Sequence, residues 1–303
     1  MRFNPKARLD DSRVRDSGGG GGGIGGRGVV VGGGGAVGLV IAVLVLVLGG
    51  GGEGGGGLGL DGQAGGLDSS RFPQTDRYAA CDTGADANSS ADCARVAVEN
   101  SLTDFWAEEL GSGFTPVSRL QTFTGSVATA CGQATADVGP FYCPGDQGIY
   151  LDSGFFDTVL ERQLGGPDGG FVEPYVLAHE YGHHVSDLLG TMDGLDRSTG
   201  PQSDGVRLEL QADCFAGLWA AHATTTEDAT GQVLFSSLTD RDVDLALEAA
   251  AAVGDDRIQS RTQGQVTAET WTHGSAQQRQ QWFRRGFAAD SIQACDTFGA
   301  RTV

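Results

Sequence analysis

The chain has 303 residues and a formal net charge of −19, and 51 of its residues are glycine. Beyond residue 48 there are 36 acidic residues against 14 basic ones. Phosphate backbones would repel such a domain, so the composition argues against nucleic-acid binding and fits a well-solvated acidic surface.

The N-terminal part combines a low-complexity stretch with one apolar segment. Residues 29–48 carry no charge, and a helix of that length spans about 30 Å, the thickness of the bilayer hydrocarbon. Basic residues dominate the N-terminal flank, whereas Glu53 and Asp61 follow the segment. The positive-inside rule therefore predicts a cytoplasmic tail over 1–28 and a single-pass anchor in the cell membrane over 29–48. A cleaved signal peptide is the alternative, against which stand the long basic region and the lack of an A-x-A site after Leu48.

The rest of the chain divides into a linker and one globular domain. Residues 49–75 are rich in glycine and too poor in apolar residues to fold, whereas residues 76–303 suffice for one compact core. Apolar periodicity and turn residues predict an α+β domain, rich in helices, with a small mixed sheet. The expected elements, in chain order, are a helix over 90–110, strands over 117–123 and 148–152, and helices over 155–164, 172–189, 203–223, 239–253 and 275–288.

All six cysteines lie beyond residue 48, and an even number on one side of an apolar segment is typical of disulfides in an oxidising compartment. Short loops bounded by Gly, Asp or Pro separate Cys81 from Cys93 and Cys131 from Cys143, so we pair these neighbours. That leaves Cys214 with Cys295. Free buried thiols or metal ligands are the alternatives, although no C-x-x-C spacing is present.

A metal-binding pattern lies in the helix expected over 172–189. His179-Glu180-Tyr181-Gly182-His183 matches H-E-x-x-H, and residues four apart share one face of a helix. Both imidazoles can therefore bind one zinc ion, while Glu180 lies beside that face and can reach a water molecule. The alternative is a pair of solvent-exposed helix histidines that bind no metal. Apolar residues flank the motif on both sides, however, so the helix is apolar enough to be buried.

A third ligand is expected on the next helix, because a catalytic zinc usually takes three protein ligands and leaves one position open. Glu209 lies 26 residues after His183, and the glycines between them let the chain turn back. Asp213 is four residues further along the same face. We expect it to accept the second nitrogen proton of His179 or His183 and so to fix the tautomer of that ligand. Taken alone, Glu209 would be read as a solvated helix carboxylate.

His273 is a weaker candidate. It lies in the loop Trp271-Thr272-His273-Gly274, before the last expected helix. An isolated loop histidine can stabilise the oxyanion of a tetrahedral intermediate. A capping or structural histidine explains the sequence equally well.

With these residues in place, the chain resembles the bacterial family of putative neutral zinc metallopeptidases, membrane-anchored proteins with a zincin-type site. The resemblance implies a zincin-like fold, zinc ligation by His179, His183 and Glu209, and catalysis by Glu180, and it favours an active-site or structural role for His273. The chain departs from the family pattern at Ser186, where Gln is expected, and at Asp16-Ser17-Gly18, where an Arg-rich stretch is usual. The segments that carry the resemblance are Gly139-Pro140-Phe141-Tyr142-Cys143-Pro144, residues 178–185, residues 209–217, and Thr272-His273-Gly274-Ser275 with Gln278-Arg279.

The sequence therefore predicts a zinc peptidase with one Zn²⁺ per chain and its catalytic domain outside the cytoplasm. The expected mechanism is metal-assisted hydrolysis, with Glu180 as general base and an extended peptide paired to a strand over 148–152. Peptide or protein substrates and the membrane are the expected partners. Two other functions remain open: a zinc amidase acting on cell-wall peptides, and a tethered binding protein whose zinc is structural or absent.

Overall fold

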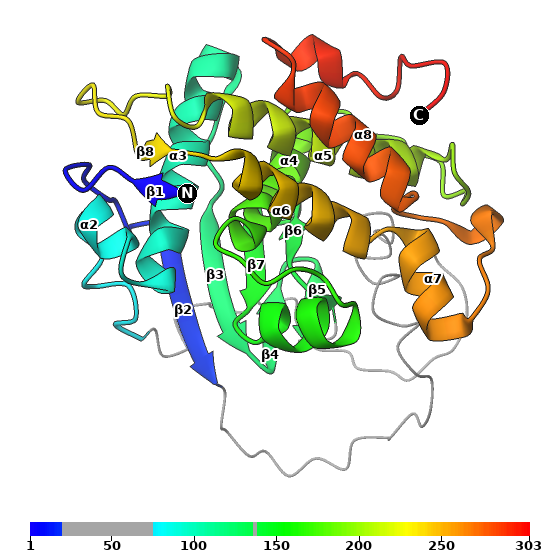
Figure 1. Ribbon diagram of the computed structural model, residues 1–303, viewed down its shortest axis with the longest axis horizontal. Coiled ribbons are helices and arrows are strands. Elements are labelled where there is room, and N and C mark those ends of the chain that lie inside the picture. The colour runs from blue at the N-terminus through cyan, green and yellow to red at the C-terminus, as the bar shows by residue number, and fades with distance from the viewer. Residues whose placement is uncertain (20–74, 136–137) are drawn as a thin grey trace, which may run out of the picture.

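A computed structural model describes residues 1–19, 75–135 and 138–303, and within these ranges the chain forms an α+β fold (Figure 1). Its largest sheet has four strands in the order β2-β3-β7-β6, beside two smaller two-stranded pairings, β1-β8 and β4-β5. The strands are β1 (Arg2–Phe3), β2 (Val14–Gly19), β3 (Arg119–Thr124), β4 (Ser126–Thr129), β5 (Gly132–Thr135), β6 (Phe141–Cys143), β7 (Gly148–Asp152) and β8 (Phe235–Ser237).

The helices account for most of the expected elements. They are α2 (Gly84–Ala87), α3 (Ala91–Leu110), η2 (Gly111–Gly113), η4 (Phe156–Gln163), α4 (Val172–Leu188), α5 (Asp204–His222), α6 (Asp240–Ala252), α7 (Asp255–Gln263), η5 (Ala268–Thr270), α8 (Ala276–Phe287) and η6 (Ile292–Cys295). The helix expected over 155–164 is a π-helix, η4. The polar helix α7 was not expected, because Ile258 is its only large apolar residue and no apolar stripe marks it.

Side chains at the helix starts explain why the larger helices begin where they do. Ser203 accepts a hydrogen bond from the Val206 N–H at the start of α5. Thr239 and Ser275 each form a reciprocal capping box, with Asp242 in α6 and with Gln278 in α8. These contacts satisfy amide groups that have no partner inside the helix, so each helix has a defined first turn.

The four-stranded sheet is mixed. β2 and β7 both pair with β3 in parallel, whereas β6 pairs with β7 antiparallel, with Tyr142 opposite Ile149. The strand expected over 148–152 is present with the same bounds, but the expectation that it offers a free edge is wrong, because β3 and β6 flank it. Within the described residues, the free edge near the active-site helix belongs to β6, which contacts α4.

The first 19 residues are part of the folded domain. β1 pairs with β8, β2 pairs with β3, and in Figure 1 these blue strands lie directly beside the body of the molecule. Arg13 of the β2 region forms an ion pair with the buried Glu99 of α3, with Nε 2.7 Å from Oε1. Asp16 accepts hydrogen bonds from the hydroxyls of Thr75 and Thr122. The N-terminal residues and the residues beyond 75 therefore share one core.

This arrangement corrects the predicted localisation. A cytoplasmic N-terminus with the catalytic domain on the other side of the membrane is wrong, because strands from both parts pair with each other. A search of the described residues finds no helix that is both long and apolar enough to span a bilayer. The expected anchor over 29–48 and most of the expected linker over 49–75 lie outside the described residues.

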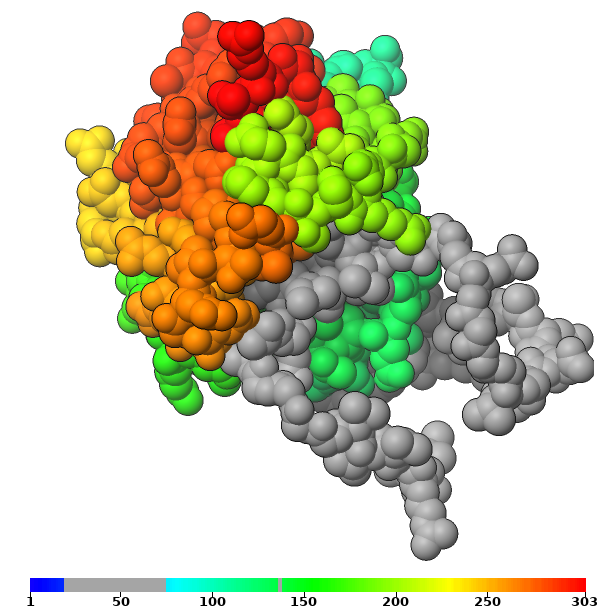
Figure 2. Space-filling model, turned by 90° about the vertical axis from the view of Figure 1, so that its right-hand side faces the viewer, coloured from blue at the N-terminus to red at the C-terminus, as the bar shows by residue number. Residues whose placement is uncertain are grey.

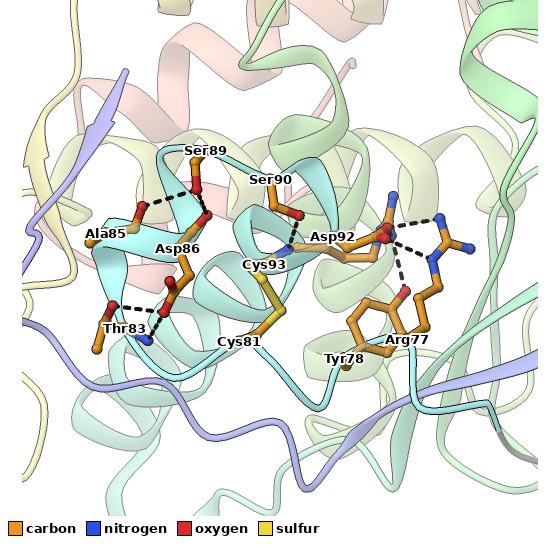
Figure 3. The surroundings of a disulfide bond; sticks show 11 residues. Arg77, Tyr78, Cys81, Thr83, Ala85, Asp86, Ser89, Ser90, Asp92 and Cys93 are labelled. Atoms are coloured by element: carbon orange, nitrogen blue, oxygen red, sulfur yellow. Dashed lines mark hydrogen bonds and ion pairs between the residues drawn. A yellow bond between two sulfur atoms is a disulfide. The ribbon is translucent and has the colours of Figure 1, made fainter.

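Three disulfides connect the chain as the sequence predicts: Cys81–Cys93, Cys131–Cys143 and Cys214–Cys295. The first joins the turn before α2 to the start of α3 (Figure 3). At the start of α2, Asp86 accepts the Thr83 hydroxyl, and at the start of α3, Ser90 accepts the Cys93 N–H. The second ties the β4–β5 hairpin to the edge strand β6. The third ties α5 to η6 near the C-terminus.

Segments that are distant in sequence meet on one face of the molecule. In Figure 2 the C-terminal residues (red) lie beside the loop after α4 and the start of α5 (yellow-green), with the orange residues of the α7 region next to them. Gln202 donates to the Val303 carbonyl at 2.8 Å, and Thr199 donates to the Glu269 carbonyl at 2.6 Å. These contacts hold the loop after α4 against the C-terminal residues and against η5, which follows α7.

The ion pair of Arg13 allows a direct test of the N-terminal docking. Arg13→Ala leaves the carboxylate of Glu99, whose side chain is only 1% exposed, without its cation, so the unfolding free energy should fall by about 1–3 kcal/mol. Arg241→Ala is the control, because its pair with Glu248 is solvent-exposed and should contribute less than about 1 kcal/mol. Urea unfolding of the full chain measures both changes. Equal small losses for the two variants would show that the N-terminal strands do not depend on this pair.

Candidate metal centre

Helix α4 carries the motif residues, and their side chains are buried inside the molecule. His179, Glu180 and His183 are all less than 8% exposed, and the imidazole rings of the two histidines lie 4.8 Å apart between centroids. The spacing of four residues puts both histidines on the same face, as the sequence predicts. Burial of three ionisable side chains on one helix is unfavourable unless each has a partner, so the neighbouring helix determines what this site can do.

Helix α5 supplies that partner because two small residues let it approach closely. A Cβ atom at Gly182 would lie 2.9 Å from the Cα and the carbonyl oxygen of Ala212, so position 182 admits only glycine without displacing α5. The crossing point lies one residue before His183 on α4 and three residues after Glu209 on α5. Close packing at this point is what brings the carboxylate of Glu209 up to the two imidazoles.

The resulting group has the dimensions of a zinc site. His179 Nε2 lies 3.1 Å from Glu209 Oε2, and His183 Nε2 lies 3.5 Å from Glu209 Oε1. Two tetrahedral ligands at 2.0–2.1 Å from zinc lie about 3.3 Å apart, so these separations fit one ion. The ligand atoms of His179, His183 and Glu209 all lie within 4.8 Å of one another and are buried. The donor set of two imidazoles and one carboxylate is typical of catalytic zinc.

One carboxylate oxygen of Glu180 has no hydrogen-bond partner among the described residues. Helix α4 packs against strand β6, yet Oε2 of Glu180 is buried and accepts no hydrogen bond from any described residue. A buried carboxylate oxygen without a donor is costly in a native structure and marks a place for a water or an ion. The free oxygen is therefore available to a water molecule beside the two histidines.

Burial and the local charges separate the titration of these groups. Burial raises the pKa of Glu180 to about 7, and burial lowers the pKa of His183 to about 4. Burial alone would lower the pKa of His179, but the charge and hydrogen bond of Asp213 raise it to about 9. Burial would raise the pKa of Glu209, but the neighbouring histidines hold it well below its usual range. Glu209 is thus the permanent anion, while Glu180 is poised to exchange a proton near neutral pH.

Asp213 lies behind His179, as the sequence predicts for one of the two histidines. It accepts hydrogen bonds from His179 Nδ1 at 2.9 Å and from the Tyr175 hydroxyl at 2.6 Å. Because Nδ1 is held by this carboxylate, Nε2 is the nitrogen that faces Glu209. His183 has no such partner, since its Nδ1 is buried and bonds to no described residue.

Arg279 is a residue of the site that the sequence did not single out. From α8 it donates to both oxygens of Asp213, at 2.7 and 2.9 Å, and its Nη2 lies 3.3 Å from His179 Nδ1. The guanidinium is 3% exposed and compensates the charge of the fully buried Asp213. Its segment, Gln278-Arg279, is part of the family resemblance, but its sequence position gives no sign that it reaches α5.

His273 does reach the site. It is 6% exposed and lines the same pocket as His179, Glu180 and Glu209. Its Nδ1 lies 2.8 Å from the Thr272 hydroxyl and 3.6 Å from Asp255 Oδ1. Asp255 is a second residue that the sequence did not single out. Its Oδ2 accepts the backbone N–H groups of Thr272, His273 and Gly274, so it holds the whole loop in place.

The remaining histidine on α4 has a structural role. His184 is fully buried, with Nδ1 3.0 Å from the Tyr142 hydroxyl and Nε2 2.7 Å from the Thr115 carbonyl oxygen. Ser186, where the chain departs from the family pattern, donates to Gln211 of α5 at 2.8 Å. Both contacts fix α4 against β6 and α5, and neither places a further ligand at the metal site.

A pocket of about 380 Å³ opens onto these residues. One part of its wall is formed by His179, Glu180, His183, Glu209 and His273. Most of the remaining wall is apolar and comes from the loop before β6, from η4, and from the ends of α6 and α7. Concave, mostly apolar pockets of this size with a few convergent polar groups are typical of ligand sites.

Comparison with known proteins identifies the family. The family model described as "Putative neutral zinc metallopeptidase" matches residues 1–298. An uncharacterized protein of Mycobacterium tuberculosis, Rv2575, is 50% identical over 222 residues, which cover 73% of this chain and 75% of the relative. The uncharacterized protein YpfJ of Escherichia coli is 41% identical over 187 residues, covering 60% of this chain and 61% of the relative. No solved structure matches the chain.

The geometry predicts a graded loss of zinc affinity. Glu209→Ala removes a ligand and should weaken zinc binding by more than about 100-fold, whereas Asp213→Asn should cost about 10–100-fold, the usual effect of losing a partner behind a ligand. Glu161→Ala, on η4, should leave the affinity unchanged. Competition with a chelator measures the three constants, and thermal unfolding checks that each variant is folded. Equal affinities for the Glu209 and Glu161 variants would remove Glu209 from the site.

Proposed function

The chain belongs to the neutral zinc metallopeptidase family, and from this premise we propose that it is a zinc-dependent peptidase. The observation that carries the proposal is the buried group of His179, His183 and Glu209, with the free oxygen of Glu180 beside it. A structural zinc site normally closes with a fourth protein ligand, often Cys, whereas all six cysteines here form disulfides. The group also opens onto a pocket, which a structural site does not need.

His179, His183 and Glu209 would hold one zinc ion, which supplies a Lewis acid for the scissile carbonyl and makes water more acidic. Glu180 takes a proton from the attacking water through Oε2 and then gives it to the leaving amine nitrogen. Asp213, itself held by Arg279 and Tyr175, keeps the imidazole of His179 in the tautomer that leaves Nε2 free.

His273 is proposed to donate a hydrogen bond to the oxygen of the scissile carbonyl as negative charge develops there. Thr272 and Asp255 contact its Nδ1 side, so the opposite nitrogen is the one available to the pocket. When Nδ1 accepts the Thr272 hydroxyl proton, the opposite nitrogen carries the ring proton and can donate it into the pocket.

The edge strand β6 is proposed as the surface on which the substrate backbone lies. Strand β6 packs against helix α4, which carries the candidate base Glu180. An extended peptide can add to the free edge of a sheet through main-chain hydrogen bonds. β6 replaces β7 in this role, because β7 lies between two strands. The proposed substrates are therefore peptides, or protein segments that can become extended.

Glu180→Gln separates catalysis from metal binding. The amide keeps the shape of the side chain but cannot act as a base, so hydrolysis should fall by about 10²–10⁴-fold while the chain still binds one equivalent of zinc. Turnover of an unbiased peptide library and elemental analysis of zinc measure the two properties. Unchanged turnover in the variant would exclude Glu180 as the base. A zinc-loaded wild type that cleaves no peptide would point instead to a binding protein.

His273→Ala should lower kcat by about 10²–10³-fold, the usual effect of losing an oxyanion donor, with little change in zinc content. His222→Ala is the control, because His222 lies at the end of α5 and stacks on Phe105 away from the pocket. Steady-state kinetics on one cleaved peptide give both values. If both variants keep the wild-type kcat, His273 has only a structural role.

A further inference from the structure

The wall of the pocket beyond the metal site implies a preference for one class of substrate. Besides its polar end, most of the pocket wall is apolar, with Gln163, Arg261 and Thr262 as the polar exceptions. Val138 and Pro140 precede β6, Val159 and Leu160 belong to η4, Val253 follows α6, and Ile258 belongs to α7. Because helices α4 and α5 separate residues 138–164 from residues 249–262 in the sequence, the apolar wall is a product of the tertiary fold and not of one amphipathic helix.

The wall is fixed in shape by close contacts behind it. A Cβ atom at Gly139 would lie 3.1 Å from the ring of Phe155, and one at Gly166 would lie 2.8 Å from the side chain of Leu160. Both glycines therefore allow the chain to press Phe155 and Leu160, which line the pocket, into one position. A preformed apolar cavity loses little entropy when a side chain enters it, so it discriminates by size and polarity.

The charges of the pocket exclude basic side chains. Its lining contains two carboxylates, Glu180 and Glu209, and both belong to the metal site. The cations in the lining are Arg261 and Arg279, of which Arg279 is paired with Asp213. A lysine or arginine side chain that entered the apolar part would lose its hydration and gain no acidic partner there, which is strongly unfavourable.

We propose that this pocket takes a large apolar side chain next to the scissile bond, so that the enzyme cleaves peptides beside Leu, Phe or Met and rejects Lys and Arg at that position. The proposal rests on the proposed peptidase function and adds its substrate class. Val253 is a specificity-determining residue, because it lines the pocket at the end of α6, is only partly buried, and so can be enlarged without replacing a core side chain. One methylene more or less in an apolar pocket changes kcat/KM by about 10–200-fold.

The test uses three peptides that differ only in the residue beside the bond that is cleaved: Leu, Ala and Lys. For the zinc-loaded wild type, kcat/KM should be at least about tenfold higher for the Leu peptide than for either of the others. Val253→Phe fills the pocket and should lower the ratio of the Leu to the Ala peptide by at least about tenfold. Val243→Phe enlarges a partly buried valine of the same helix that does not line the pocket, and should leave that ratio unchanged.

The outcomes separate the two proposals. Equal cleavage of the three peptides, or a ratio unaffected by Val253→Phe, would overturn the apolar pocket and leave the peptidase function intact. Absence of cleavage of any peptide by the zinc-loaded wild type, in the same assay and in a broad library, would overturn the peptidase function itself. Val253→Met is a smaller enlargement at the same position and repeats the test if the Phe variant does not fold.

Discussion

The close packing of helix α5 is the constraint on which the site depends. α5 contacts α4 and α8, and glycines mark both contacts. Gly182 of α4 admits the backbone of Ala212, whereas Gly217 of α5 and Gly286 of α8 lie so close to the facing backbone that any Cβ atom would collide with it. The candidate metal site between α4 and α5 therefore lies beside a contact at which small residues let the two backbones approach closely.

The same packing creates an electrostatic problem, which the fold solves inside the core. Glu180, Glu209 and Asp213 are all buried on two neighbouring helices. Arg279 enters from α8 and forms a paired charge with Asp213, so one of these anions is compensated without any metal. The charge of Glu209 faces His179, His183 and His273, which is the arrangement expected around a cation site. The three carboxylates thereby have different surroundings, since Asp213 is paired with Arg279, Glu209 faces the histidines, and Glu180 keeps one oxygen without a partner among the described residues.

The N-terminal residues show a limit of composition as a guide to architecture. Their basic charge resembles the cytoplasmic flank of a membrane anchor, yet β2 is an edge strand of the sheet that carries β6 and β7, and β1 pairs with β8. The four-stranded sheet therefore links the beginning of the chain to helix α4, which contacts β6. The parallel pairing of β2 with β3 joins residues about 100 positions apart, and no local sequence pattern predicts which strand pairs with β2.

What the sequence determined by itself is local. The four-residue spacing of His179 and His183, the caps at Ser203, Thr239 and Ser275, and the short cysteine loops each depend on neighbours along the chain, so their helices and disulfides follow from pattern and propensity. Glu209 could be predicted as the candidate third ligand because a catalytic zinc usually takes three protein ligands and Glu209 lies on the next helix. Only the tertiary structure decided which histidine Asp213 holds, that Arg279 and Asp255 support the site, that β6 and not β7 is the edge, and where the apolar pocket lies. These features join elements that are distant in sequence, and their contacts arise from packing, for which a single sequence carries no periodic signal.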